Sequence, residues 1–260
     1  MSPNRKSAIH QKAGSEMSEY LLFFFITIVV SSFFAMGGIG SAVALVPIFD
    51  FLGLGFNLAK AIALFVNTST TLTATILNIK RKVLDIRFAL PLVISSMLSA
   101  PLGAISSKYI DTTYIKWGFV GFLLFSATML IFSKKETKLK YEQAWILYAV
   151  GAIVGYISGI LGVGGGSVIM PIMILLGFDA KKMAIAVSFM VPFSTFSAFL
   201  SYASFVQIDW ILLSITAVAA IVGGYIGNRI MHFKLDAQHI KKIIAILLYL
   251  IAIKMIWSLM

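Results

Sequence analysis

The sequence predicts an all-α protein that crosses a membrane many times and is built from two homologous halves. Of its 260 residues, 60% are hydrophobic and only 12% are charged, whereas a soluble domain carries roughly 25% charged residues. A glycine cluster at 162–166 interrupts a long apolar run, and a fainter one does so at 37–40. Lipid tolerates a break in a helix only where protein or a cavity encloses it. Two such breaks are therefore typical of a transporter with repeated broken helices.

Eight apolar segments approach or exceed the length of about 20 residues that a membrane-spanning helix needs. The longest, 20–52 and 143–176, each contain one glycine cluster. A single straight helix of that length would overshoot the roughly 30 Å of hydrocarbon. Each half is thus expected to hold one glycine-broken first segment followed by three transmembrane helices. The six uninterrupted segments are 59–78, 86–107, 112–133, 182–205, 208–231 and 239–259.

Charged stretches mark the expected boundaries. Residues 1–19 are polar and basic and are expected to form a disordered tail, followed by a first transmembrane repeat at 20–133. A charged linker at 134–142, expected to be cytoplasmic, leads to the second repeat at 143–260. The net charge of +11 comes largely from cations in short loops beside apolar segments. That placement is typical of cytoplasmic loops and gives no indication of nucleic-acid binding.

The repeat is visible when the chain is shifted by 124 residues without a gap. Identical residues with positional roles then align, which is less expected by chance than a match of apolar residues. Asp85 and Asp209 each stand just before a segment, where we expect them to cap a helix. The aligned pairs of this kind are Gly38 and Gly162, Gly40 and Gly164, Pro47 and Pro171, Gly53 and Gly177, Asp85 and Asp209, and Gly103 and Gly227.

The loop cations predict the direction of the repeats, because cytoplasmic loops carry an excess of Lys and Arg. Parallel repeats, in which every segment crosses once, would leave these cations nearly balanced between the two sides. If the two glycine-broken segments instead enter, break and return, nearly all loop cations fall on one side, although the basic tail falls on the other. This arrangement makes the halves inverted repeats and assigns Lys60 to an outside loop. Its cytoplasmic loops are 80–87, 134–140, 181–182 and 229–242.

The second glycine cluster lies in a recognisable motif. Residues 159–171 read Gly-Ile-Leu-Gly-Val-Gly-Gly-Gly-Ser-Val-Ile-Met-Pro, and Ala-Val-Ser-Phe follows at 186–189. This pattern resembles the TauE/SafE sulfite-exporter family, in which both halves carry a glycine triplet, an apolar run to Pro and a small-residue site on the next helix. The first half departs from it, with Gly-Ile-Gly-Ser-Ala at 38–42 and Ala-Leu-Phe at 63–65. The resemblance, which covers the chain after residue 19, implies membrane passage of small sulfur-containing or organic anions.

The glycines are the first candidates for holding such an anion. Glycine lets backbone approach a ligand closely, and successive N–H groups form a concave anion site. The residues after each cluster are expected to form short half-helices whose positive N-terminal ends face each other near the midplane. Close packing of helices is the alternative explanation of such glycines. The candidate binding glycines are Gly38, Gly40, Gly164, Gly165 and Gly166.

Polar side chains on the helix after each break are the second set of candidates. Asn67 and Thr71 share one face of the first of these helices, and Ser188 and Thr195 lie on the second. Hydroxyls and amides donate hydrogen bonds to oxyanions without bringing charge into the bilayer. Hydrogen bonds back to their own helix are the alternative role for Ser and Thr. No Lys or Arg occurs within 20–52, 61–79 or 143–180, so binding is expected to depend on polar groups rather than on a buried cation.

These features predict a secondary transporter of small anions in the plasma membrane. A passive anion channel and a non-transporting membrane enzyme or assembly component are the alternatives. We expect no catalytic residues, metal site or cofactor, because the chain has no Cys and only three scattered His. Expected partners are the small anion and the bilayer, and no nucleic acid. A coupling ion (proton or sodium), a homo-oligomer, the particular anion and the direction of transport stay open.

Overall fold

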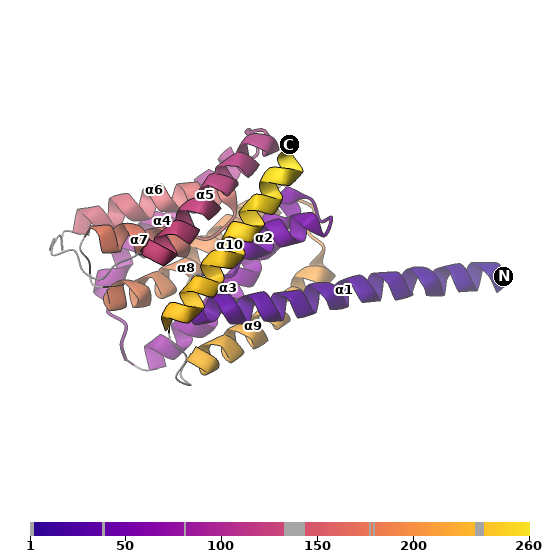
Figure 1. Cartoon of the computed structure of the whole chain (residues 1–260), viewed down its shortest axis with the longest axis horizontal. Coiled ribbons are helices and arrows are strands. Elements are labelled where there is room, and N and C mark those ends of the chain that lie inside the picture. The colour runs from indigo at the N-terminus through magenta and orange to yellow at the C-terminus, as the bar shows by residue number, and fades with distance from the viewer. Residues whose placement is uncertain are drawn as a thin grey trace.

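The computed structural model of the chain describes residues 3–37, 40–80, 82–132, 144–176, 178, 180–231 and 237–260. Within these residues the protein consists of ten α-helices and no strand, which confirms the predicted all-α class (Figure 1). The helices are α1 (Pro3–Gly37), α2 (Ala42–Phe51), α3 (Phe56–Lys80), α4 (Ile86–Ser106), α5 (Thr112–Phe132), α6 (Ala144–Leu161), α7 (Gly166–Leu175), α8 (Ala180–Ala203), α9 (Trp210–Met231) and α10 (Ala237–Leu259).

The helices have the lengths and surfaces of a multi-pass membrane protein. Among the described residues, seven helices are long and apolar enough to cross a bilayer. Large apolar side chains face outward, as Leu98 (67% exposed), Leu102 (59%) and Ile253 (58%) illustrate. Extensive apolar surface is a liability in water but is the natural contact surface for lipid. The two ten-residue helices α2 and α7 are too short to span and follow the glycine clusters.

The N-terminal segment differs from expectation. Helix α1 begins at Pro3, so most of 1–19, expected as a disordered tail, is helical and projects beyond the bundle (Figure 1). This segment contains Ala, Lys, Gln, Met and Glu, which favour helix, and no Pro after Pro3. A helix that starts in the apolar span can therefore continue back toward the N-terminus.

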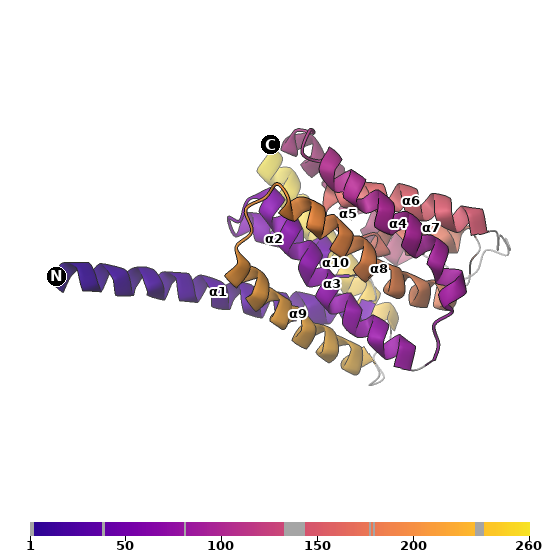
Figure 2. The ribbon, with the colours of Figure 1, turned by 180° about the vertical axis from the view of Figure 1, so that it is seen from behind.

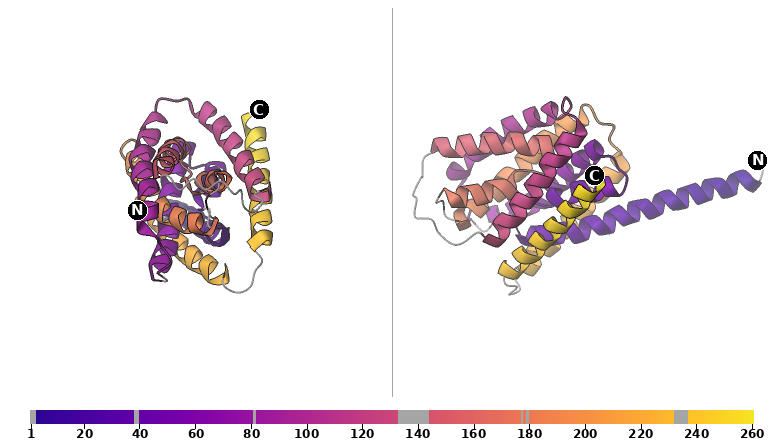
Figure 3. Two further views of the ribbon diagram at one scale, coloured as in Figure 1. Left: turned by 90° about the vertical axis from the view of Figure 1, so that its left-hand side faces the viewer. Right: turned by 45° about the horizontal axis from the view of Figure 1, so that its top comes forward.

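The packing of the helices is the same when the two halves are exchanged. Helix α4 packs against α6 and α8, and its counterpart α9 packs against α1 and α3 (Figure 2). Helices α3 and α8 pack against each other, as do α5 and α10 on one flank (Figure 3). Gly103 and Gly227, aligned by the repeat, play matching roles. A Cβ on Gly103 would collide with the Tyr156 backbone, and one on Gly227 with that of Ser32. Each half thus packs closely on the first helix of the other.

The two aspartates aligned by the repeat cap helices, as predicted. The Oδ1 atom of Asp85 accepts a hydrogen bond from the N–H of Phe88 at 3.1 Å. The Oδ1 atom of Asp209 accepts bonds from the N–H groups of Ile211 and Leu212, both at 3.0 Å. These bonds satisfy N–H groups that have no partner within the first turn of α4 and α9.

Both glycine-broken segments turn back on themselves. The rings of Phe23 in α1 and Phe49 in α2 are 5.2 Å apart, so α2 returns alongside α1. In the second half, a Cβ on Gly165 would lie 3.3 Å from Val154 Cγ1 of α6. Figures 1 and 2 show α2 and α7 running back beside the helices that precede them. The glycine clusters therefore end one helix and begin a short returning one.

Side-chain contacts identify which loops share an end of the bundle. Lys182, at the start of α8, lies 3.8 Å from Asp85, at the start of α4. At the opposite end, Lys108 after α4 lies 6.0 Å from the ring centre of Phe205 after α8. The C-terminal end of α3 therefore lies beside the N-terminal end of α8, so these equivalent helices run in opposite directions.

Cysteine labelling tests this placement, since the chain has no native cysteine. We expect Val83→Cys and Lys182→Cys to react with a membrane-impermeant thiol reagent from one side of the membrane. Tyr109→Cys, at a position 80% exposed at the opposite end, should react from the other side. Labelling of the Val83→Cys and Lys182→Cys variants from opposite sides would contradict the returning path of α6 and α7.

Candidate functional site

The two breaks have matching backbone conformations. Gly40 has φ +86°, and its repeat partner Gly164 has φ +71°, a left-handed conformation that other residues adopt only at a cost. Gly162, at φ +74°, ends α6. The N–H groups of Gly162 and Val163 both donate to the carbonyl of Ser158, at 2.8 and 3.2 Å. Glycine is therefore required at the residue that follows α6 and in the turn that precedes each half-helix.

Both breaks contact the side chain of Asn67. A Cβ on Gly40 would lie 2.5 Å from Asn67 Oδ1, and a Cβ on Gly164 would lie 2.6 Å from Asn67 Nδ2. The Asn67 amide is thus wedged between the two glycines, one from each half. It comes from the middle of α3 and is completely buried. The structure therefore joins three of the predicted site residues at one point.

The half-helices start beside this amide. Ser41 and Gly165 occupy equivalent positions before α2 and α7. The Ser41 carbonyl accepts the first backbone bonds of α2, from Ala44 at 3.1 Å and Leu45 at 3.0 Å, and Gly165 does the same for α7. The first N–H groups of a helix have no intrahelical acceptor and mark its positive end. Two positive helix ends therefore lie close to Asn67.

Unpaired polar atoms gather around the breaks. Asn67 Nδ2 and Oδ1 both lack a hydrogen-bond partner, as do the hydroxyls of Ser41, Ser158 and Ser167. All four residues are buried, and Thr27 and Ser126 are the remaining cases among the described residues. Leaving a buried polar group unpaired costs about 1–3 kcal/mol. A concentration of such groups at one point is typical of a site completed by a polar ligand or by water.

The other predicted side chains are mostly occupied by their own helices. Thr71 donates to the Asn67 carbonyl at 2.6 Å, and Ser188 donates to the Ile185 carbonyl at 2.8 Å. The hydroxyl of Thr195 contacts the Val191 carbonyl at 2.8 Å, while its methyl group would meet a Cβ on Gly164 at 2.6 Å. Asn67 is thus the predicted polar side chain whose hydrogen-bonding capacity is unused.

The predicted glycines do not all face this amide. A Cβ on Gly165 would point at Val154 and Ser158 of α6, at 3.3 and 3.4 Å, so Gly164 faces Asn67 and Gly165 does not. Gly166 is buried as the first residue of α7. Gly38 lies outside the described residues.

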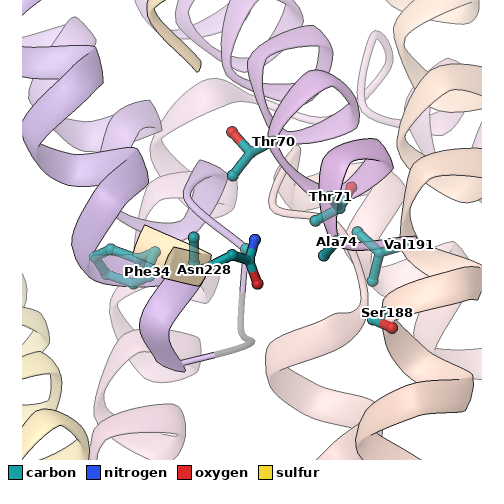
Figure 4. Close-up of a pocket in the computed structure, with 9 residues that line it drawn as sticks. Phe34, Thr70, Thr71, Ala74, Ser188, Val191 and Asn228 are labelled. Atoms are coloured by element: carbon teal, nitrogen blue, oxygen red, sulfur yellow. The ribbon is translucent and has the colours of Figure 1, made fainter. Parts of the chain in front are cut away.

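A pocket extends from Gly40 along α3 and α8 toward the end of the bundle that carries Asp85 and Lys182. It contains about 350 Å³ of empty space, counting its open mouth. Figure 4 shows Thr70, Thr71 and Ala74 of α3 and Ser188 of α8 on its walls. The predicted residues Thr71 and Ser188 therefore line the approach rather than the point where the breaks meet. Phe34, Ala35, Val191 and Asn228 complete the lining.

Lys60 lies within a helix and not in the outside loop that the sequence predicted. It lies in the second turn of α3 and is completely buried. The helix begins earlier than expected, at Phe56, where Gly55 (φ +73°) accepts the first backbone bond, from Ala59 at 2.9 Å. The prediction that no buried cation lies near the breaks is therefore wrong. The signal was present in the sequence, because Lys60 precedes Asn67 by seven residues and shares its helix face.

The fold and the paired breaks are those of a membrane transporter with internal repeats. Comparison with known sequences identifies the family. The sequence model of the family described as Sulfite exporter TauE/SafE matches residues 23–255. The chain belongs to this family.

Two similar proteins are described as membrane transporters. The chain is 26% identical over 250 residues to the "Probable membrane transporter protein YunE" of Bacillus subtilis (strain 168), covering 85% of this chain and 91% of that protein. It is 29% identical over 186 residues to the "Probable membrane transporter protein MJ0441" of Methanocaldococcus jannaschii, covering 68% of this chain and 69% of that protein. Both similarities agree with the class that the fold indicates.

A double-mutant cycle tests the wedge between the breaks. We expect Gly164→Ala to destabilise the protein by about 1–3 kcal/mol or more, because it strains the backbone and collides with Asn67. In an Asn67→Ala background the collision with the amide disappears and only that with the Thr195 methyl group remains, so the same change should cost less, with a coupling of about 0.5–3 kcal/mol. Thermal unfolding in detergent measures both costs.

Gly121→Ala is the control for this cycle, since a Cβ there has no neighbour within 4 Å. It should leave the melting temperature nearly unchanged or raise it. Equal costs of Gly164→Ala with and without the Asn67 amide would show that the two residues do not touch.

Proposed function

We propose that the protein is a secondary transporter of small anions in the plasma membrane, with sulfite or a related sulfur-containing or organic anion as its substrate. The observation that carries this proposal is the unpaired amide of Asn67 between Gly40 and Gly164. The family membership supports an anion as cargo.

The electrostatics of the break favour an anion. Each helix N-terminus carries about half a positive charge, and two of them begin beside Asn67. The Asn67 amide adds two N–H donors, and the unpaired serine hydroxyls can add theirs. Such fixed donors replace part of the hydration shell of an oxyanion. A cation would meet the same donors and the same positive ends, which is unfavourable.

We also propose that the two halves are inverted repeats about this site. The opposite directions of α3 and α8 support this, as does the exchange of packing partners between α4 and α9. In this arrangement the loops after α3 and before α8 are cytoplasmic. The pocket along Thr71 and Ser188 then approaches the site from the cytoplasm. Transport would require this approach to close and the opposite end to open.

The test of the binding role is Asn67→Leu. Because Leu has a similar volume and no unpaired amide, melting temperature should stay the same or rise, the relief being at most about 1–3 kcal/mol. Sulfite flux into proteoliposomes should fall strongly, because the donors between the breaks are lost. Ser188→Ala should have a smaller effect, since that hydroxyl already donates to Ile185.

The same assay decides between classes of function. A transporter should show counterflow, in which unlabelled sulfite inside the vesicle accelerates uptake of labelled sulfite. A passive channel should show no such acceleration. Robust flux of a matched cation, or anion flux that is indifferent to Asn67→Leu, would contradict the proposal.

A further inference from the structure

Lys60 is a buried cation that the site described above does not use. Its side chain is completely buried on α3. Its stem packs against the break of the second half, where a Cβ on Gly162 would lie 2.5 Å from Lys60 Cγ. Its ammonium lies 5.0 Å from the ring centre of Phe56 and 4.8 Å from that of Tyr202. Lys60 is therefore enclosed between two aromatic rings beside the second glycine break.

The ammonium has little to bind. Among the described residues, its one hydrogen bond goes to the carbonyl of Ile160, at the long distance of 3.5 Å. That carbonyl already has a closer partner in the Tyr202 hydroxyl, at 3.1 Å. An ammonium carries three donors, and a buried charge is costly unless it is paired. The C-terminal end of α6 offers partial compensation through its dipole, but two donors remain unused.

No carboxylate neutralises this charge within the part of the chain that the structure describes. The ion pairs found there are Lys116 with Asp50 at 2.6 Å and Lys182 with Asp85 at 3.8 Å. Lys116 lies 5.1 Å from the ring centre of Phe56, but it is satisfied by Asp50. Lys60 is thus a buried positive charge without a negative partner among the described residues.

The position of Lys60 relates it to the proposed anion site. Seven residues separate it from Asn67, which corresponds to two helical turns and about 10 Å along α3 on the same face. Gly162 contacts Lys60 and Gly164 contacts Asn67, so the second break runs along α3 from one residue to the other. The pocket reaches the breaks from the opposite direction. Lys60, Phe56 and Tyr202 therefore form a closed layer between Asn67 and the end of the bundle that carries Lys108.

We propose that Lys60 is a second anion-binding point on the transport path, which receives the small oxyanion after Asn67 when the closed layer opens. The inference rests on the proposed transport function and adds a residue that determines charge selectivity. The oxyanion supplies the negative partner that the ammonium lacks. Without an anion, the ammonium rests against the aromatic rings and the end of α6. Cations are rejected at this layer because they meet an uncompensated positive charge.

A purely structural role for Lys60 is the competing explanation, in which it only caps α6. The two roles differ in accessibility. A structural cap stays buried, whereas a residue on the path becomes accessible to water during transport. The absence of native cysteine makes this difference measurable with Lys60→Cys in proteoliposomes, by reaction with a positively or negatively charged methanethiosulfonate.

We expect Lys60→Met and Lys60→Cys to lower sulfite flux about tenfold or more, the size of effect that follows from loss of one charge-assisted buried contact. Lys60→Met should keep its melting temperature, because an apolar side chain replaces an unpaired buried charge. The aminoethyl reagent should modify the Lys60→Cys variant during turnover and restore flux, since it rebuilds an ammonium. The sulfonatoethyl reagent should modify it and leave flux low. Ile62→Cys, fully buried on another face of α3, is the matched control and should stay unreactive.

Three results separate the possible failures. If wild type carries no sulfite and no other small anion tested, the proposed function is wrong. If wild type carries sulfite and Lys60→Met carries it equally well, only the role of Lys60 is wrong. If the thiol of the Lys60→Cys variant stays unreactive during turnover while flux is lost together with melting temperature, Lys60 is a structural cap. Should Lys60→Met fail to fold, Lys60→Gln and the aminoethylated Lys60→Cys variant provide the same comparison.

Discussion

The contact on which the rest of the structure depends is the wedge of the Asn67 amide between Gly40 and Gly164. A side chain on either glycine would displace the amide, and the positive φ angles exclude most other residues there. The wedge fixes how close the starts of α2 and α7 lie to the middle of α3. It also brings one residue from each half to the same point. A polar group is left unpaired at that point, and under the proposed function the anion becomes its hydrogen-bond partner.

Breaking two helices inside a membrane is feasible here because each half encloses the break of the other. Helix α4 covers α6, and α9 covers α1, with Gly103 and Gly227 permitting backbone contact in both cases. Lipid therefore does not reach the freed N–H and carbonyl groups, which would otherwise cost several kcal/mol each. The apolar outer faces meet the bilayer, and the polar groups face inward. The same interior that encloses the breaks also holds Asn67 and Lys60, the two residues to which we assign anion binding.

Much of this arrangement was predictable from the sequence, because glycine, proline and aspartate have strong positional preferences. The breaks, the repeat and the helix caps at Asp85 and Asp209 follow from such residues. Side-chain direction was less predictable. Thr71 and Ser188 bond to their own helices, a choice that depends on local geometry. Lys60 was missed because α3 starts one turn earlier than its apolar pattern suggests, through the turn at Gly55. Because α3 begins one turn earlier than expected, Lys60 lies in the protein interior and not in the predicted loop.

The location of a bound anion tests the central claim most directly. Selenite has the shape and charge of sulfite, and selenium gives an anomalous signal that marks its position in crystals of the protein. The account predicts a selenium peak within hydrogen-bonding distance of Asn67 Nδ2, between Gly40 and Gly164, that disappears in Asn67→Leu. A peak that persists in that variant, or that lies only among the exposed lysines at the ends of the bundle, would contradict it.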